Sequence, residues 1–237
     1  MIGGDPMQLG PVIFSPFTKK YGLSVSLLER LMTNVMYTPD EGLKYDERCI
    51  TMLKQNYRSH CDLIVVPNRL FYKGQLIPSE SSSITDSCLN MALLPNSAPL
   101  LFHGVLAQEM REGHSNSFFN PSEVIIATDY VSKIVTEGIK PTAIGVISPY
   151  SKQVEKIKKN LANIGLSDVT VGTVENFQGQ ERQVIVISTV RSSPSYLLPD
   201  SGYQCGFLSN PKKVNVAITR SMALLVVVGC PLVLKQV

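Results

Sequence analysis

The stretch VTVGTVENFQGQERQVIVISTVR, residues 169–191, decides the fold. It begins as a short apolar strand, changes to a polar loop over residues 176–182, and resumes as VIVIST. The β-branched residues of this last run are typical of a strand buried on both faces. The run QGQE, residues 178–181, places amide and carboxylate groups beside a glycine that lets another molecule approach the backbone. A polar connection between core strands and a binding loop both explain this composition.

A second stretch, NPKKVNVAITRSMALLVVVG at residues 210–229, predicts a helix followed by another buried strand. Asn210 suits the helix N-cap and Pro211 the first turn, and residues 223–229 are apolar. Arg220 therefore falls at a helix-to-strand junction. Ligands of an open parallel sheet bind at the carboxyl ends of its strands, and we expect Arg220 near that edge, where a fixed cation suits a phosphate. An arginine here also suits the helix C-terminus, where its charge complements the helix dipole.

The composition is that of an ordinary globular chain. The 237 residues suffice for one large domain with a core. Hydrophobic residues make up 44% and charged residues 17%, which excludes a disordered chain. The formal net charge of +3 permits nucleic acid as a partner but does not by itself indicate one.

The five cysteines are scattered, with no C-x-x-C pair, and only three histidines accompany them. Neither a zinc site nor a disulfide framework is indicated, so we expect no metal ligands in this chain and a reducing compartment. No apolar run approaches the roughly 20 residues of a membrane span, and the N-terminus lacks the features of a signal peptide. We therefore expect a cytosolic or nuclear protein without a membrane-spanning segment.

Several segments of the N-terminal part have recognisable patterns. Residues 1–11, MIGGDPMQLGP, suit a loop with no strand before it, so we expect the chain to begin inside a larger protein. Residues 24–32 have helical spacing, and residues 34–48 lack a period, as in a surface loop. Residues 50–53, ITML, are strand-like, and apolar positions along one face predict a helix over residues 60–72.

Tyr57 and Arg58 lie side by side just before that helix. They suit a core aromatic beside a solvated charge as well as a binding site. Residues 79–97 are rich in serine and lack a pattern, which predicts a loop or family-specific insertion. Residues 99–105 look like a strand. Residues 120–137 predict a helix, with a capping asparagine, a proline in the first turn and a glutamate three residues after the cap.

Residues 143–150, AIGVISPY, predict a buried strand with a polar end. The next helix, residues 151–164, buries an apolar stripe and turns its lysines outward, as a solvated face or as a weak electrostatic contribution to nucleic-acid binding. From residue 143 onward the order is strand, helix, strand, strand, helix, strand. This order predicts an α/β fold with a mostly parallel sheet and helices on both faces.

Four stretches together resemble motifs III, IV, V and VI of superfamily 1B helicases. They are GDPMQLGP (4–11), NYRSH (56–60), GTVENFQGQERQVIVISTVR (172–191) and NVAITRS (215–221). Two more, REGHSNSFFNPSE (111–123) and VISPYSKQVEKI (146–157), are most similar to the Armitage branch, the RNA helicases of small-RNA (piRNA) silencing. The chain resembles the nonsense-mediated-decay helicases more than it resembles the DNA-directed members of the superfamily.

The resemblance implies a RecA-like fold of the P-loop NTPase type. Residues 1–22 would be the trailing edge of a first RecA-like domain, with motif III, and a linker. Residues 23–237 would be the second RecA-like domain, with a variable loop near residues 79–97. The sequence holds no G-x-x-x-x-G-K-[ST] loop, so ATP would be the cofactor together with Mg²⁺ whose ligands belong to the first domain. We expect this chain to be inactive as an ATPase alone.

The resemblance also assigns roles in ATP hydrolysis. Gln8 would sense the γ-phosphate or orient the attacking water. Arg58 and Arg220 would act as arginine fingers, because a guanidinium makes two parallel charged hydrogen bonds and keeps its proton. Motif VI continues as Ser221 and Met222 where many relatives place a basic residue, which puts a secondary phosphate or RNA contact in doubt.

Further residues would contact the nucleotide. Tyr57 would lie near the nucleoside, Gly179 would belong to the ATP-binding loop, and Glu181 would accept hydrogen bonds from the ribose hydroxyls. Single-stranded RNA would lie across the top of both domains. Its contacts here would come from Ser148, Pro149, Tyr150, Thr173 and Val174. They would hold mainly the sugar-phosphate backbone, so we expect little base specificity and 5′-to-3′ movement.

The implied partners are single-stranded RNA, the first RecA-like domain of the same chain and proteins of a small-RNA pathway. The implied location is the cytoplasm, including ribonucleoprotein granules. Two alternatives stay open: a DNA-directed superfamily 1B helicase of replication or repair, and a non-catalytic RNA or protein docking module. Retention of Gln8, Arg58, Glu181 and Arg220 together argues against the docking module.

Overall fold

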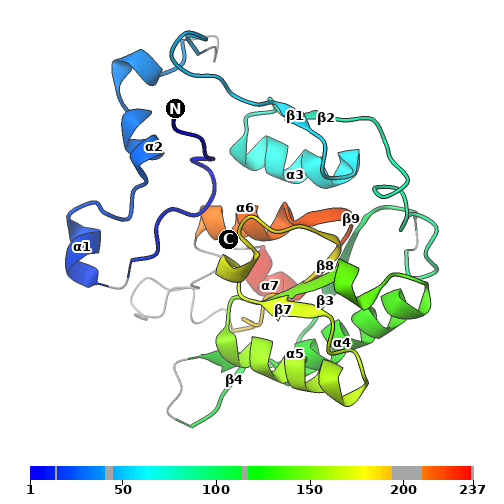
Figure 1. The fold of residues 1–237 in the computed structure, drawn as a ribbon. Helices are drawn as coiled ribbons and strands as arrows, with labels where there is room; N and C mark the ends of the chain where they lie inside the picture. The colour runs from blue at the N-terminus through cyan, green and yellow to red at the C-terminus, as the bar shows by residue number, and fades with distance from the viewer. Residues whose placement is uncertain (14, 41–44, 95, 114–116, 194–209, 236–237) are drawn as a thin grey trace.

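A five-stranded sheet in which every neighbouring pair is parallel forms the centre of the computed structural model (Figure 1). The structure describes residues 1–13, 15–40, 45–94, 96–113, 117–193 and 210–235. The strand order is β3-β9-β8-β6-β7. The strands are β3 (Leu100–Gly104), β6 (Ile144–Ile147), β7 (Thr170–Gly172), β8 (Arg182–Ser188) and β9 (Ser221–Gly229). The predicted parallel α/β fold is confirmed.

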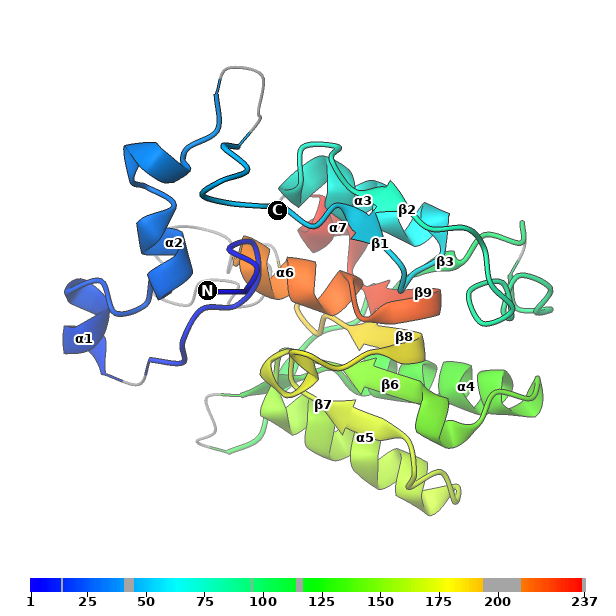
Figure 2. The ribbon, with the colours of Figure 1, turned by 45° about the horizontal axis from the view of Figure 1, so that its top comes forward.

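Helices cover both faces of this sheet (Figure 2). One face carries α4 (Pro121–Thr136) and α5 (Ser151–Asn163), and the other carries α3 (Cys61–Phe71), α6 (Pro211–Ile218) and α7 (Pro231–Leu234). The side chains of β8 alternate between the two faces. Val184 and Val186 belong to the core cluster under α4 and α5, and Ile185 and Ile187 to the cluster under α3, α6 and α7. The run VIVIST is therefore buried on both faces, as predicted.

The smaller elements lie in the N-terminal part and in the connections. They are α1 (Pro16–Lys20), α2 (Leu27–Leu31), η1 (Val35–Tyr37), β1 (Gln55–Asn56), β2 (Ile77–Pro78), β4 (Met110–Arg111), β5 (Phe118–Phe119), η2 (Pro141–Ala143) and η3 (Glu175–Phe177). Strands β1 and β2 form a parallel pair, and β4 and β5 form an antiparallel hairpin. No described helix is long and apolar enough to cross a membrane.

The predicted helix starts are confirmed at two asparagines. Asn210 accepts hydrogen bonds from the amides of Lys212 and Lys213, and Asn120 accepts from those of Ser122 and Glu123. A proline occupies the first turn after each cap. These caps satisfy amides that have no partner inside the helix, which fixes where the helices begin.

Three predictions for the N-terminal half need correction or refinement. Residues 50–53 are not a strand: pairing begins at Gln55, and Leu53 is 87% exposed, so these residues have neither a partner strand nor a core to face. The predicted loop at 34–48 contains the short η1 helix, and its residues 41–44 lie outside the described residues. The 79–97 segment is a loop, as predicted, but it places Cys88, Met91 and Leu94 in the core cluster under α4 and α5.

Glu123 takes a different role from the capping partner that its spacing predicts. Its side chain is fully buried, and its Oε2 accepts from Ser188 Oγ at 2.6 Å and from the Val190 amide at 2.9 Å. The Asn120 amide, which a capping box would give to this carboxylate, donates instead to Gln153 Oε1 at 2.9 Å. Tertiary contacts at the end of β8 therefore take Glu123 away from its own helix.

We expect Gly145→Ala to destabilise the fold. A Cβ on Gly145, in β6, would lie 2.6 Å from Phe177 Cε1 and 2.8 Å from Ile185 Cδ1, and both side chains are fully buried. Overpacking of this kind costs roughly 1–3 kcal/mol in the free energy of unfolding, measured by urea titration. Gly104→Ala in β3 is the matched control, because its Cβ would meet nothing closer than 3.6 Å. Equal stability of the two variants would contradict this packing.

A pH-dependent loss of stability should follow from Glu123. Burial raises the pKa of this carboxyl from 4.5 to about 7, against the opposing effect of its hydrogen bonds from Ser188 and Val190. Because the folded state prefers the protonated form, the stabilisation is complete below pH 4.5 and is lost as the pH rises through about 7. Between pH 4.5 and 8 the wild type should lose roughly 3 kcal/mol relative to Glu123→Gln, which keeps an acceptor oxygen but cannot ionise.

Urea unfolding of the wild type and Glu123→Gln at the two pH values measures that difference. Glu80→Gln, at an exposed position, is the control for loss of one carboxylate. A constant difference between wild type and Glu123→Gln across this range would show that Glu123 does not titrate as its burial requires.

Candidate functional site at the two edges of the sheet

Arg58, Glu181 and Arg220 come together at the amino-terminal ends of β8 and β9. Arg58 Nη2 lies 3.4 Å from Glu181 Oε2, and Arg58 Nη1 lies 3.5 Å from the carbonyl oxygen of Thr219. Arg220 is 2% exposed and donates through Nη1 to the carbonyl oxygen of Gln180 at 3.5 Å. Three of the residues that the motifs single out, far apart in the sequence, therefore form one cluster.

The electrostatics of this cluster favour an anionic ligand. Burial and the nearby charge of Arg58 together lower the pKa of Arg220 to about 10, while Glu181 opposes the shift. Arg220 still carries its proton near pH 7. The two guanidinium groups lie near the carboxylates of Glu181 and Asp5, and their charged N–H donors suit a polyphosphate.

Arg220 also caps its helix, which was the alternative role. Its Nε donates to the carbonyl oxygen of Val216 at 3.0 Å, and its Nη2 donates to Thr219 Oγ1 at 2.9 Å. The first bond uses a backbone carbonyl in the C-terminal turn of α6, and the second goes to the side chain of the residue after the helix. The guanidinium is consequently held in one orientation by the end of the helix, and capping and ligand binding do not exclude each other.

The expectation that Arg220 lies at the carboxyl edge of the sheet is wrong. The amide of Arg182, the first residue of β8, donates to the carbonyl oxygen of Arg220, and Arg182 pairs with Ser221, the first residue of β9. The reason is topological: a helix between parallel strands returns the chain to the edge where strands begin. A helix-to-strand junction therefore lies at the amino edge.

Gln8 is held beside this cluster by a network that sequence patterns did not reveal. Gln8 Nε2 and the Tyr72 hydroxyl both donate to Asp5 Oδ2, at 2.9 and 2.6 Å. Asn215 Nδ2 donates to the Tyr72 hydroxyl at 2.9 Å and to the Met7 carbonyl oxygen at 2.9 Å. Burial and the bond to Asp5 raise the pKa of Tyr72 to about 12. An asparagine on the buried face of α6 was the one sequence signal for this network.

The other predicted nucleotide residues are exposed. Tyr57 is 79% exposed, next to Arg58, so its ring is available to a ligand. Gly179 has φ +76°, in the left-handed region, which a residue with a Cβ rarely adopts. The conformation of the QGQE turn thus requires glycine at this position.

The predicted RNA residues lie at the opposite, carboxyl edge of the sheet. Residues 148–150 follow β6, residues 173–174 follow β7, and the Ser148 amide donates to the Gly172 carbonyl oxygen at 3.1 Å. Ser148 and Val174 are 0% and 1% exposed as whole residues, so neither their side chains nor their main chains lie open to a ligand in this structure. Pro149, Tyr150 and Thr173 are half-buried.

The connection between β7 and β8 carries residues of both predicted sites. Residues 173–181 leave β7 at the carboxyl edge and enter β8 at the amino edge, on the face that carries α3, α6 and α7. Phe177, fully buried in η3, anchors this connection against Gly145. Asn176 Oδ1 accepts from the amide and hydroxyl of Thr173, and Lys213 Nζ lies 2.7 Å from Glu175 Oε1.

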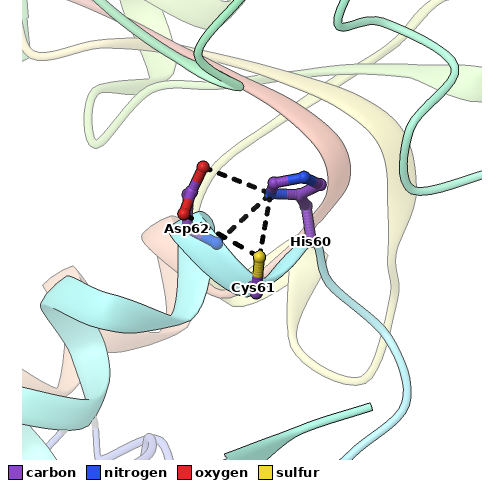
Figure 3. A group of neighbouring side chains, drawn as sticks. All are labelled: His60, Cys61 and Asp62. Carbon is purple, nitrogen blue, oxygen red and sulfur yellow. Dashed lines mark hydrogen bonds and ion pairs between the residues drawn. The ribbon is translucent and has the colours of Figure 1, made fainter. Parts of the chain in front are cut away.

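His60, Cys61 and Asp62 bring potential metal ligands together at the start of α3 (Figure 3). His60 Nδ1 lies 3.8 Å from Cys61 Sγ and 3.7 Å from Asp62 Oδ2. The same nitrogen accepts from the Asp62 amide at 3.2 Å and so serves as the helix N-cap. A metal on Nδ1 would displace this cap. The sequence predicted no metal ligands here, and helix capping accounts for the group without one.

The chain's donor set fits the anionic part of ATP better than magnesium. Arg58 and Arg220 supply charged donors, whereas the carboxylates beside them, Glu181 and Asp5, are engaged by Arg58 and by Tyr72 and Gln8. Mg²⁺ prefers carboxylate oxygens and water. That the magnesium ligands lie in another domain stays a prediction.

The chain is similar along its length to several helicases. The chain is 48% identical over 245 residues to the RNA helicase Mov10l1 of Mus musculus, with 100% of this chain and 21% of the relative covered. It is 45% identical over 252 residues to the putative helicase mov-10-B.1 of Danio rerio, with 99% and 25% covered. It is 33% identical over 246 residues to the probable RNA helicase armi of Drosophila melanogaster, with 98% and 21% covered.

The resemblance to RNA helicases of the Armitage type is therefore confirmed along the whole chain, which spans 21% to 25% of the length of these relatives. The family model for the AAA domain matches residues 23–232. The parallel sheet, covered by helices on both faces, agrees with this match. The chain belongs to the AAA domain family, and its sequence is similar to helicases.

Proposed function

We propose that this chain is the second RecA-like domain of an ATP-dependent 5′-to-3′ RNA helicase. The observation that carries the proposal is the cluster of Arg58, Glu181 and Arg220, with Gln8 held beside it. Residues 1–22 would come from the edge of the first RecA-like domain, which would supply the phosphate loop and the ligands of Mg²⁺. The names of the relatives, RNA helicases and helicases, support the reaction class.

Arg220 is the group best placed to stabilise the transition state. Its guanidinium is already removed from water and oriented by the bonds to Val216 and Thr219. Contact with a phosphoryl group would require movement of the residues that cover it. When bound, ATP supplies the phosphoanhydride that is hydrolysed. The cluster contributes positive charge, and Gln8 contributes an amide that can orient a water molecule.

The carboxyl edge would hold the RNA strand. Pro149, Tyr150 and Thr173 are partly exposed there and could contact the strand. Contacts of this kind hold the sugar-phosphate backbone and discriminate bases weakly. Movement along RNA would follow from opening and closing of the two domains.

The biological setting is a further part of the proposal. We place the whole protein in small-RNA (piRNA) silencing, in the cytoplasm and its ribonucleoprotein granules, with proteins of that pathway as partners. The similarity to armi and to Mov10l1 supports this setting. The alternatives, a DNA-directed helicase and a docking module, make different predictions for strand preference and for turnover.

In a protein that joins this chain to its first RecA-like domain, Arg220→Ala should lower kcat for RNA-stimulated ATP hydrolysis by at least about a hundredfold. Arg220→Lys should lower it nearly as much, because lysine keeps the charge but loses the fork of parallel donors. Steady-state ATPase assays and melting temperatures measure both effects. Since Arg220 also caps α6, the alanine variant should lose up to roughly 1 kcal/mol of stability as well.

Lys140→Ala, at an exposed position before β6, is the control for the loss of one positive charge. A lysine variant at position 220 with normal turnover would mean that Arg220 is a helix cap and not a finger.

The 237-residue chain by itself should bind single-stranded RNA weakly and with little regard for sequence. Its contacts are to phosphates and sugars, so binding should release counterions and the affinity should fall steeply between 50 and 200 mM salt. Fluorescence anisotropy with oligonucleotides of equal length and different sequence measures both properties. Affinity that persists at high salt, or that differs strongly between sequences, would favour a dedicated recognition module instead.

A further inference from the structure

The β4–β5 hairpin packs against the carboxyl edge of the sheet, beside the predicted RNA residues. Phe118 of β5 is 5% exposed and lies between two guanidinium groups. Arg111 Cζ is 4.0 Å from the ring centroid and Arg191 Cζ is 4.3 Å from it. The ring of Tyr150 meets Phe118 edge-on, with centroids 5.7 Å apart. The hairpin therefore continues the surface on which Tyr150 lies.

The two arginines of this stack differ in exposure. Arg191 is 2% exposed, and its Nε lies 3.3 Å from Oε1 of Glu109, which is 3% exposed. Glu109 Oε2 also accepts hydrogen bonds from the Ser192 amide and hydroxyl and from the Ser193 hydroxyl. Arg111 is exposed. Arg191 is thus buried, paired with Glu109 and in contact with the ring, and Arg111 lies at the surface on the same ring.

The segment after β8 is held in a strained conformation next to this stack. Val190 has φ +71°, which is rare for a β-branched residue. Its amide donates to the buried carboxylate of Glu123 at 2.9 Å, and Glu109 holds the next residues. Strained backbone persists where its surroundings enforce it, and such sites cluster where ligands bind.

A polar cavity of about 370 Å³ opens beside the stack. Its lining residues are Gln108, Glu109, Met110, Arg111, Phe118 and Ser193. The guanidinium of Arg111 covers the aromatic wall of this cavity. Stacking on a ring uses the face of a guanidinium, whereas its N–H donors lie in its plane. Two of these donors can therefore give parallel hydrogen bonds to a phosphate while the face stays stacked.

We propose that Arg111 and this cavity form a phosphate-binding subsite for the RNA strand, next to Tyr150. The ligand is a phosphodiester group of single-stranded RNA, and the inference rests on the proposed function. The stack holds the guanidinium before the strand arrives, which reduces the conformational entropy lost on binding. Contact with a phosphate, and not with a base edge, agrees with the weak base specificity expected of this surface.

The test compares binding of a fluorescent 15-nucleotide oligouridylate by the 237-residue chain and its variants, by anisotropy at several salt concentrations. Arg111→Ala should weaken binding at least about fivefold at low salt and lower the slope of log affinity against log salt by about one. Arg111→Lys should recover the slope but only part of the affinity. Lys140→Ala, which also removes one charge but lies before β6 at the other edge, should leave affinity unchanged.

Tyr150→Ala separates this inference from the proposed function. If Tyr150→Ala weakens binding and Arg111→Ala does not, the subsite is wrong while the RNA surface stands. If the wild-type chain binds no RNA, both fail. Release of RNA by millimolar inorganic phosphate at constant ionic strength would identify a free phosphate as the ligand and overturn the assignment to RNA. Melting temperatures within about 2 °C of wild type establish that the variants at the exposed Arg111 are folded.

Discussion

The contact between Phe177 and Gly145 is the constraint on which both candidate sites depend. Strands β7 and β8 are parallel and stand on either side of β6, so their connection has to cross that strand. It crosses where a glycine leaves room for a buried aromatic ring. This anchor fixes residues 173–174 at the carboxyl edge and residues 178–181 at the amino edge. A displacement of the ring would therefore disturb the two proposed sites together, the one for the nucleotide and the one for RNA.

Both edges use buried charge, which is costly unless it is paired or hydrogen-bonded. At the amino edge, Arg220 satisfies the end of α6 and remains charged. At the carboxyl edge, Glu109 and Arg191 neutralise each other, and Glu123 accepts from Ser188 and the backbone. These groups fix local conformation at the ends of strands. Rigid side chains at strand ends keep a site in its binding geometry. The protein can then bind and release a ligand without refolding around it.

Local signals predicted the helices and the sheet well, because proline, asparagine caps and β-branched runs act over a few residues. The asparagines at 120 and 210 and the VIVIST run are examples. The predictions were wrong where contacts between residues far apart in the sequence determine the local structure. ITML at 50–53 lacks a partner strand, Glu123 leaves its helix for Ser188, and Arg220 lies at the edge opposite to the one expected. The cluster of Arg58, Glu181 and Arg220 could be named from motifs, but its network with Asp5, Tyr72 and Asn215 required the fold.

The weakness of the pair between Arg58 and Glu181 is informative. Their side chains are 36% and 46% exposed and their closest atoms are 3.4 Å apart, so the pair contributes roughly 0–1 kcal/mol. In the proposed function Glu181 accepts from the ribose, and this contact competes with Arg58 for the same carboxylate. A nucleotide can therefore exchange the pair at little cost and leave Arg58 available to the phosphates. Arg220, buried and fixed by α6, undergoes no such exchange. In the proposed function the two arginines would therefore differ: the ligand would release Arg58, whereas Arg220 is oriented before the ligand arrives.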